Sequence, residues 1–396
     1  MLHARLAADI GGTFTDVVLE HGGRRRSVKV LTTPRAPEEG MLEGIARVLA
    51  EAKLRPADIG VLIHGTTLAT NALIERKGAK TALITTAGFR DVLEMGYEKR
   101  YEHYDLQLEL PEPLVPRDLR FAVEERMTAK GEIRTPLNEK VFSDIALKIK
   151  TAKVQAVAVG FLHSYVNDTH EKRAGELLAR ALPGVAITLS SAVCPEMREY
   201  ERFSTACANA YVQPLMTSYL DRLASELKRR GFGCPLYLMT SGGGLTTLET
   251  ARRFPVRLVE SGPAGGAILS AGLARENRLD EVLSFDMGGT TAKICFIGQW
   301  RPEQSRKFEV ARVWRNLKGS GLPVRIPVTE MVEIGAGGGS IARLDELKRI
   351  QVGPASAGAE PGPACYGRGG NEPTVTDANV VLGRVDPDAF AGGTLQ

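Results

Sequence analysis

The sequence has 396 residues, of which 43% are hydrophobic and 25% are charged, and its formal net charge is +4. These values are ordinary for a soluble globular protein, and the length predicts about two or three domains. The small positive excess is spread along the chain and gives no indication of nucleic-acid binding. Asp9 interrupts the first apolar segment, which argues against a signal peptide, and the most apolar long stretch, residues 262 to 274, is too short to span a membrane. Five widely spaced cysteines without a CxxC pair favour a reduced, cytoplasmic protein.

The first third of the chain predicts three antiparallel strands followed by alternating helices and strands. The predicted strands of the meander are residues 6–10, 13–20 and 27–31, with turns at Gly11-Gly12 and Gly22-Gly23. A helix is expected over residues 38–52, because its apolar residues recur at helical spacing. The units that follow are a strand at 59–63, a helix at 66–77, a strand at 80–85 and a helix at 88–95. This alternation predicts an α/β sheet covered by helices.

Residues 97 to about 137 interrupt this rhythm, because they are rich in Glu, Tyr, Pro and Arg without a clear period. We therefore expect an excursion from the sheet there. Regular elements are predicted again at 154–161 (strand), 168–181 (helix), 203–229 (helix), 236–239 (strand), 262–274 (helix) and 282–285 (strand). Beyond Ile297 the chain looks rich in loops. We expect a first lobe over residues 1–275 and the incomplete start of a second lobe over residues 276–396.

One five-residue pattern occurs twice, as Asp9-Ile10-Gly11-Gly12-Thr13 and as Asp286-Met287-Gly288-Gly289-Thr290, each between apolar strands. Paired glycines let a backbone turn tightly and present its N–H groups to a phosphate. A carboxylate at the strand end is placed to hold Mg²⁺ through water, so Asp9 and Asp286 are the predicted metal and catalytic residues. A single copy could be an ordinary hairpin turn, but two copies favour a phosphate site. The predicted cofactor-binding residues are Gly11, Gly12, Thr13, Thr15, Gly288, Gly289, Thr290 and Thr291.

Two facing hairpins that hold a nucleotide resemble the actin, sugar-kinase and heat-shock-chaperone ATPase superfamily, which implies ribonuclease-H-like α/β lobes. Further strings resemble the hydantoinase A/5-oxoprolinase family along essentially the whole chain. They include Asp9 to Asp16, His64 to Thr67, Ala69 to Ala72, Thr85 to Asp91, Glu201 to Ala206, Asn209 to Val212, Ser241 to Gly244, Glu260 to Gly266, Phe285 to Thr291, Gly335 to Ala342, Pro361 to Gly367 and Thr376 to Asn379.

This resemblance implies an ATP- and Mg²⁺-dependent enzyme that phosphorylates the amide oxygen of a cyclic amide, of the hydantoin or 5-oxoproline type, and so opens the ring. It also implies a partner subunit or domain of the hydantoinase B type, and therefore a hetero-oligomer. Related carboxylases would use the same fold on an enol or on bicarbonate, and a nucleotide-binding protein without turnover is a further alternative. Family members continue into an adenosine-binding segment and a C-terminal domain. We find neither before Gln396, so we expect this chain to need another part, on the same or a separate chain.

Candidate substrate residues follow the predicted strand at 59–63 and the one at 80–85. They are His64, Thr66, Thr67, Asn71 and Arg90. The carboxyl ends of strands are the usual ligand sites in α/β folds. The alternative for Thr66 or Thr67 is a helix cap, and for Arg90 an ion pair with Asp91. The loop from Gly335 to Ser340 could contact the ligand or be a structural turn. The remaining histidines have no metal-ligand spacing.

Overall fold

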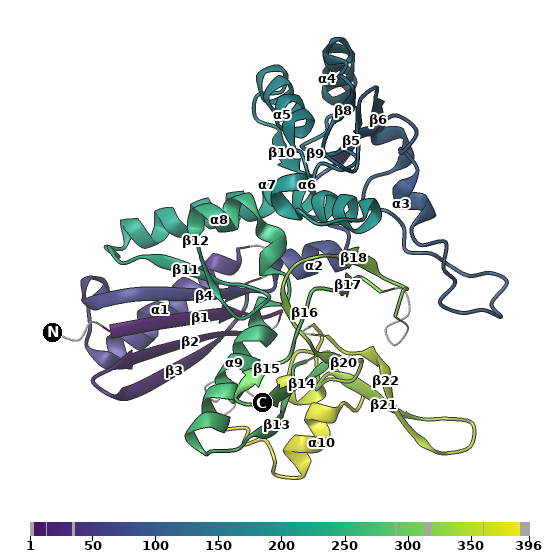
Figure 1. Cartoon of the computed structure of the whole chain (residues 1–396). Coiled ribbons are helices and arrows are strands. Elements are labelled where there is room, and N and C mark those ends of the chain that lie inside the picture. The colour runs from purple at the N-terminus through teal and green to yellow at the C-terminus, as the bar shows by residue number, and fades with distance from the viewer. Residues whose placement is uncertain are drawn as a thin grey trace.

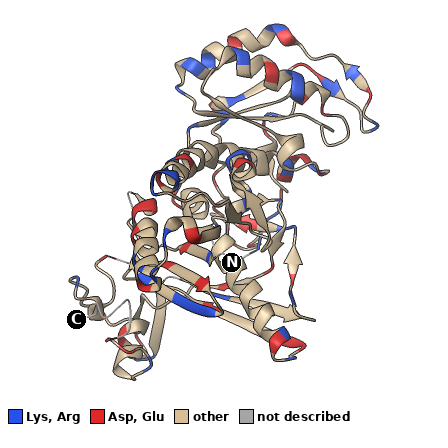
Figure 2. Cartoon of the chain, turned by 90° about the vertical axis from the view of Figure 1, so that its left-hand side faces the viewer, with Lys and Arg blue, Asp and Glu red and all other residues tan. Residues whose placement is uncertain are grey.

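The computed structural model describes residues 4–12, 14–33, 36–289, 291–312, 318–358 and 360–388. Helices and strands are mixed along the whole of this part of the chain, which confirms the α/β class predicted from their alternation. Figure 1 shows one sheet with its helices at the left, a second group at the top, and the C-terminal third of the chain at the lower right. Basic and acidic residues are interspersed over these elements (Figure 2).

The first sheet has six strands in the order β12-β11-β4-β1-β2-β3. Their bounds are β1 (Ala4–Ile10), β2 (Phe14–His21), β3 (Arg24–Leu31), β4 (Ile59–Thr66), β11 (Leu236–Met239) and β12 (Leu245–Thr247). The strands β1, β2 and β3 form the predicted antiparallel meander. On the other side of β1, strand β4 runs parallel to β1 and β11 runs parallel to β4. The carboxyl ends of β1, β4 and β11 therefore point to the same edge of the sheet.

Helices cover this sheet, and their bounds are α1 (Pro37–Ala52), α2 (Leu68–Ile74), α7 (Glu199–Arg229), α8 (Leu248–Arg253) and α9 (Ser261–Glu276). The helix α1 buries Met41, Ile45 and Val48, which recur at helical spacing on its inner face. It lies close to β2, since a Cβ on Gly44 would come within 2.8 Å of Val17. The 31-residue helix α7 is buried along most of its first half and packs against elements of both large sheets.

A second sheet has four parallel strands in the order β10-β9-β5-β6. Their bounds are β5 (Thr81–Thr86), β6 (Arg120–Val123), β9 (Ala156–Gly160) and β10 (Ala186–Leu189). The expectation that residues 97 to 137 leave the sheet is wrong for β6, which pairs with β5 along its length. Arg120 occupies this strand although it is buried, because its guanidinium donates to the carbonyl of Val115 and to Glu94. The charged side chain of Arg120 is the reason why the sequence pattern did not predict a strand here.

Helices and short elements complete this second region. They are α3 (Val92–Met95), α4 (Phe142–Thr151), α5 (Thr169–Ala181), α6 (Ser190–Val193), the β7–β8 pair (Arg126–Met127 and Ile133–Thr135), and the 3₁₀ turns η2 (Arg117–Leu119) and η3 (Glu139–Val141). The 3₁₀ turn η1 (Pro56–Asp58) directly precedes β4 of the first sheet. The helix predicted at 88–95 is limited to α3. Gly88 has φ of +86°, which begins a turn and not a helix.

The C-terminal third is built on the antiparallel hairpin β13 (Glu281–Met287) and β14 (Ala292–Gly298). The second edge of β14 pairs with β15 (Arg301–Pro302) and β20 (Val332–Ile334). The region expected to be loop-rich also contains the pairs β16–β19, β17–β18 and β21–β22. The remaining bounds are β16 (Gln304–Ser305), β17 (Phe308–Val310), β18 (Leu322–Val324), β19 (Val328–Thr329), β21 (Ser340–Leu344), β22 (Ile350–Ser356), α10 (Val375–Val381), η4 (Pro255–Leu258) and η5 (Ala364–Tyr366).

The segment from β16 to β19 connects this third to the rest of the molecule. Its residues Leu322, Val324 and Ile326 are buried in the main hydrophobic core, which also contains α7. The amide of Arg325 donates to Thr205 Oγ1 of α7 at 2.8 Å. This segment therefore attaches the C-terminal third to the N-terminal part by apolar packing.

The structure pairs none of the five cysteines in a disulfide. Within the part of the chain that the structure describes, no helix combines the length and apolarity that a membrane crossing requires.

Candidate functional site

The two Asp-Gly-Gly-Thr segments are the turns of two structurally equivalent hairpins. In the first, the N–H of Gly11 donates to the carbonyl of Phe14 at 2.9 Å. In the second, the N–H of Gly288 donates to the carbonyl of Thr291, also at 2.9 Å. Thr13 and Thr290, which were predicted to bind the cofactor, lie outside the described residues. The sequence repeat is therefore a repeat of backbone geometry as well.

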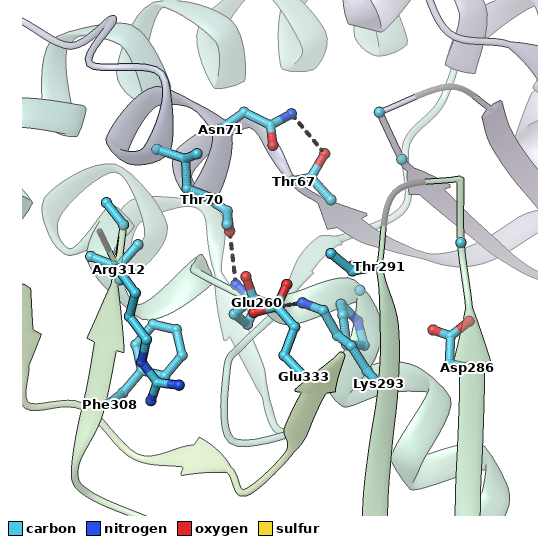
Figure 3. Close-up of a pocket in the computed structure, with 18 of the residues that line it drawn as sticks. Thr67, Thr70, Asn71, Glu260, Asp286, Thr291, Lys293, Phe308, Arg312 and Glu333 are labelled. Atoms are coloured by element: carbon cyan, nitrogen blue, oxygen red, sulfur yellow. Dashed lines mark hydrogen bonds and ion pairs between the residues drawn. The ribbon is translucent and has the colours of Figure 1, made fainter. Parts of the chain in front are cut away.

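A cavity of about 560 Å³ lies between the two turns (Figure 3). Its walls come from both hairpins, from α2, from the start of α9 and from the β17 region. Eight of the residues predicted from sequence line it: Asp9, Gly11, Gly12, Thr67, Asn71, Asp286, Gly288 and Thr291. The other lining residues are Thr70, Ile74, Glu75, Glu260, Gly262, Pro263, Lys293, Phe308, Glu309, Val310, Ala311, Arg312 and Glu333.

The carboxylate of Asp9 occupies a narrow space at the end of β1. The register places Asp9 beside Gly65 of β4, and a Cβ on Gly65 would lie 2.5 Å from Asp9 Oδ1. Gly262 borders the same carboxylate from α9, where a Cβ would lie 3.2 Å from Oδ1. Glycine at both positions therefore makes room for the carboxylate.

Asp9 Oδ1 is buried and has no hydrogen-bond partner. The pKa of Asp9 is raised to about 6, mainly by burial and in addition by the nearby carboxylates of Asp16 and Asp286, against the opposing effect of Lys29. A buried carboxylate oxygen without a partner is energetically costly, because it has lost its water and gained nothing in exchange. A cation at this position would remove that cost.

The side chains around the cavity fit Mg²⁺ held together with phosphates. Six carboxylates line the cavity against the two cationic side chains of Lys293 and Arg312. A polyphosphate would be repelled by this excess of negative charge unless a cation accompanied it. No cluster of three or more potential metal-ligating side chains occurs among the described residues. Mg²⁺ suits such a site, because it binds through one or two carboxylates, waters and substrate phosphates.

Lys293 and Glu260 are functional candidates that the sequence prediction missed. Lys293 lies directly across the hairpin from Asp286 and, on its other side, across from Glu333 of β20. Its ammonium group forms an ion pair with Glu260, and both side chains are largely buried. The spacing of the repeat could have indicated Lys293. Asp16 follows Asp9 at the interval at which Lys293 follows Asp286, so the two positions are equivalent.

Residues of α2 form the wall opposite the second hairpin (Figure 3). Thr67 Oγ1 donates to the carbonyl of Ile10 at 3.2 Å, and Asn71 Nδ2 donates to Thr67 Oγ1 at 3.4 Å. Thr70 Oγ1 accepts a hydrogen bond from the N–H of Glu260 at 3.0 Å. These bonds attach α2 to the first turn and to the start of α9.

Five predicted residues do not line the cavity: Thr15, His64, Thr66, Arg90 and Gly289. His64 is fully buried on the opposite side of β4 from Gly65, because successive strand residues face opposite ways. Its Nδ1 is 3.1 Å from the carbonyl of Ala8, and its Nε2 is 2.7 Å from the hydroxyl of Tyr219. Burial lowers the pKa of His64 to about 4, so the ring is neutral near pH 7.

Three of the other four, Thr66, Thr15 and Arg90, lie outside the cavity in the following positions. Thr66 Oγ1 accepts a hydrogen bond from the N–H of Leu68 at the start of α2. The N-cap residue of α2 is Thr67, and its side chain makes no capping hydrogen bond. Thr15 Oγ1 is 3.0 Å from Thr32 Oγ1 on the buried side of β2. Arg90 follows β5 in the second sheet. Its neighbour Asp91 pairs with Arg117, not with Arg90.

The loop from Gly335 to Ser340 supports the second turn from behind. The N–H of Gly338 donates to the carbonyl of Gly288 at 2.9 Å, and the N–H of Gly339 donates to that of Gly289 at 2.7 Å. None of the loop residues lines the cavity. Of the two roles considered for this loop, the structure shows the structural one.

Comparison with known proteins places this geometry in a family. The profile described as "Hydantoinase/oxoprolinase N-terminal region" matches residues 5–182, and the profile described as "Hydantoinase/oxoprolinase" matches residues 202–396. The chain belongs to the hydantoinase/oxoprolinase family. The family resemblance expected from the sequence strings is thus confirmed.

Two curated relatives match nearly all of this chain. An uncharacterised protein of Methanocaldococcus jannaschii is 44% identical over 99% of this chain and 58% of its own length. The alpha subunit of caprolactamase from Pseudomonas jessenii is 37% identical over 99% of this chain and 56% of its own length. The chain therefore spans a little over half the length of these relatives.

Solved structures show the same fold. The ATP-dependent caprolactamase of Pseudomonas jessenii matches with a TM-score of 0.82 and 36% identity, over 99% of this chain and 57% of that one. Nucleotide-free acetone carboxylase, an enzyme of ATP-dependent acetone carboxylation, matches with a TM-score of 0.83 and 26% identity, over 100% of this chain and 57% of that one.

Proposed function

We propose that this chain supplies the phosphate-binding part of an ATP-dependent enzyme that opens a cyclic amide by phosphorylating its amide oxygen. The observation that carries the proposal is the convergence of both Asp-Gly-Gly-Thr turns on one cavity that also contains the unpartnered carboxylate oxygen of Asp9. The similarity to an ATP-dependent caprolactamase supports the choice of reaction, because caprolactam is a cyclic amide.

The two lobes are proposed to be of the ribonuclease-H-like, actin type. The order β3-β2-β1-β4-β11, with an antiparallel meander followed by two parallel strands, supports this assignment for the first lobe. The hairpin of β13 and β14 would open the second lobe, since it repeats the turn of β1 and β2. The proposed boundary between the lobes lies near residue 275.

The chemistry suits this arrangement. Amide resonance makes the ring carbonyl a poor electrophile, and transfer of the terminal phosphoryl group to the amide oxygen converts that oxygen into a leaving group. Water then adds to the carbon and the ring C–N bond breaks, so that the amine leaves and an acyl phosphate remains. A second water hydrolyses the acyl phosphate to the carboxylate and inorganic phosphate. The turn N–H groups of both hairpins would bind phosphate oxygens, and Asp9 and Asp286 would hold Mg²⁺, which neutralises charge on the phosphates.

The proposed substrate site is the end of the cavity away from Asp286. It is bordered by Thr70, Asn71 and Ile74 of α2 and by Phe308 of β17, a mixture of hydrogen-bonding and apolar groups that suits a small amide ring. An ATP-dependent carboxylase is the second candidate, because the match to acetone carboxylase is equally complete. In that case a ketone enol or bicarbonate would accept the phosphoryl group at the same place.

A partner is also proposed. Leu283, Phe285 and Val332 lie on the β13–β14–β20 sheet with 68%, 62% and 63% of their surface exposed. An apolar sheet face of this kind usually packs against another element. We propose that further chain or a hydantoinase B-type subunit covers it, since the caprolactamase relative is itself a subunit.

The test is turnover of the complete enzyme. ATP hydrolysis should depend on the presence of a lactam, hydantoin or 5-oxoproline, whereas a carboxylase would require a ketone and bicarbonate. ATP hydrolysis that none of these compounds stimulates would contradict both candidates.

The first prediction concerns the two aspartates. Asp9→Ala and Asp286→Ala should each lower ATP-dependent turnover at least about 100-fold, because each removes a carboxylate that positions metal and phosphate. Asp144→Ala removes an exposed carboxylate that does not line the cavity and serves as the control, with turnover expected to be unchanged. Near-normal turnover in both cavity variants would mean that the turns are only structural.

A further inference from the structure

Lys293 is the cationic residue of the second hairpin that faces the cavity. Its side chain is only 15% exposed, and three carboxylates surround it: Asp286 and Glu333 on the neighbouring strands and Glu260 at the start of α9. Figure 3 shows the ammonium group directed toward Glu260. Burial lowers the pKa of the Lys293 amine, so the protein bears a cost for keeping this charge inside.

The equivalent position of the first hairpin carries the opposite charge. Asp16 lies across from Asp9 as Lys293 lies across from Asp286. Asp16 pairs with Lys29 at 2.7 Å, with 48% and 38% of the two side chains exposed. Neither of them lines the cavity. The two turns are thus alike in backbone but different in charge, and only the second brings a cation into the cavity.

This difference matters for a bound polyphosphate. Most charged groups around the cavity are carboxylates, which can bind a metal but repel phosphate oxygens. A lysine ammonium group has three donors and is a common phosphate ligand. Glu260 is the present partner of Lys293 and the N-cap residue of α9. It could remain charged without Lys293, because the helix dipole favours a carboxylate at this end of a helix.

We propose that Lys293 binds the terminal phosphate of the nucleotide and that this phosphate displaces Glu260 from the ammonium group. The inference rests on the proposed function, because it assumes that a nucleoside triphosphate enters the cavity. No covalent bond to lysine forms. One ion pair is exchanged for another, and the charge of Lys293 is retained throughout the phosphoryl transfer.

The experiment uses calorimetry to compare the affinities of the complete enzyme for Mg-ATP and Mg-ADP. Lys293→Met should weaken Mg-ATP binding by about 10- to 100-fold, the value of one hydrogen bond to a charged group, and should weaken Mg-ADP binding much less. Lys293→Arg keeps the charge and should retain part of the preference for ATP. Lys29→Met removes the equivalent exposed ion pair of the first hairpin and should leave the ratio of the two affinities unchanged.

Glu260→Gln tests the exchange in a protein that keeps Lys293. Removing the competing carboxylate should increase the affinity for Mg-ATP relative to Mg-ADP. If the ratio of the affinity for Mg-ATP to that for Mg-ADP is lower or unchanged in Glu260→Gln, phosphate does not displace Glu260 from Lys293. This result would count even if Lys293→Met failed to fold.

The outcomes distinguish a failure of the proposed function from a failure of the role proposed for Lys293. If the wild-type protein binds no Mg-ATP, the proposed function is wrong. If the wild type binds Mg-ATP and Lys293→Met keeps the same preference for ATP over ADP, the assignment of Lys293 is wrong while the proposed function stands.

Discussion

Asp9 is the residue at which stability and proposed function conflict. Its carboxylate is tightly enclosed by two glycine positions, and Oδ1 has no hydrogen-bond partner. Because its pKa is raised from 3.8 to about 6, the folded state disfavours the charged form. The stability associated with the protonated form is fully present below about pH 4 and is lost as the pH rises through about 6. Above that range the protein holds an unfavourable charge, which suits a residue reserved for a cation.

Asp9→Asn should therefore stabilise the metal-free protein at pH 8 by about 1–3 kcal/mol, since a shift of about two pKa units corresponds to that range. At pH 4 the two proteins should have nearly the same stability. Denaturant unfolding at both pH values, in the presence of a chelator, measures the difference. Added Mg²⁺ and nucleotide should stabilise the wild type but not Asp9→Asn. A gain that is independent of pH would mean that the charge of Asp9 is not its cause.

At the scale of elements, α9 and β4 determine whether the Asp9 carboxylate fits at the end of β1. Each has a glycine next to the carboxylate, Gly65 in β4 and Gly262 in α9, and neither glycine has a side chain that would occupy its space. The helix α9 provides a matched comparison, because it also contains Gly272, where an added Cβ would meet nothing within 4 Å. Glycine-to-alanine substitutions at Gly262 and Gly272 should change helix propensity alike, but only the one at Gly262 places a methyl group against the Asp9 carboxylate.

Gly262→Ala should weaken binding of Mg-ATP, because the new Cβ would come within about 3.2 Å of the Asp9 carboxylate and displace it. Gly272→Ala should leave binding unchanged and should stabilise the fold by about 0.5–1 kcal/mol, the usual gain for alanine in a helix interior. Gly65→Ala, with its closer contact of 2.5 Å, should weaken binding more strongly than Gly262→Ala. Equal binding by the two α9 variants would show that the carboxylate tolerates the added methyl group.

At the scale of the whole molecule, the cavity depends on a connection between distant parts of the chain. The β16–β19 segment leaves the C-terminal third, packs on α7 in the main core, and supplies Phe308 to Arg312 to the cavity wall. No element of the described part of the chain covers the outer face of the β13–β14–β20 sheet, and its apolar side chains Leu283, Phe285 and Val332 are exposed. The second hairpin is therefore supported from one side by α9 and open on the other.

The 396-residue chain by itself is expected to bind Mg-ATP weakly and to hydrolyse it poorly. Turn N–H groups and Mg²⁺ bind phosphates, but adenine and ribose normally contribute much of the affinity through an apolar slot. The chain spans only 58% and 56% of the length of two relatives, so residues outside this span are expected to contribute to that slot. Calorimetry on this chain and on a version extended to the length of its relatives tests the idea. Equally tight binding by both would mean that the adenosine site lies within these 396 residues.

Sequence patterns determined the features that depend on local chemistry. Paired glycines after an apolar strand specify a tight turn wherever they occur, so both hairpins were predicted from their residues alone. Most helices and strands of the first sheet followed from apolar periodicity for the same reason, but β12 and α8 were not predicted. Family membership followed from strings that keep their order along the chain.

Only the tertiary structure decided which side chains meet. His64 and Gly65 are adjacent in sequence, yet the strand turns His64 toward Tyr219 and leaves Gly65 beside Asp9. The strand β6 was not predicted, because it begins with the charged Arg120 and the partners of that side chain, Val115 and Glu94, lie outside the strand. Glu260 and Lys293 are 33 positions apart, and no local pattern joins them. Turn and helix formation depend on neighbouring residues, whereas burial, charge pairing and cavity walls depend on residues that only folding brings together.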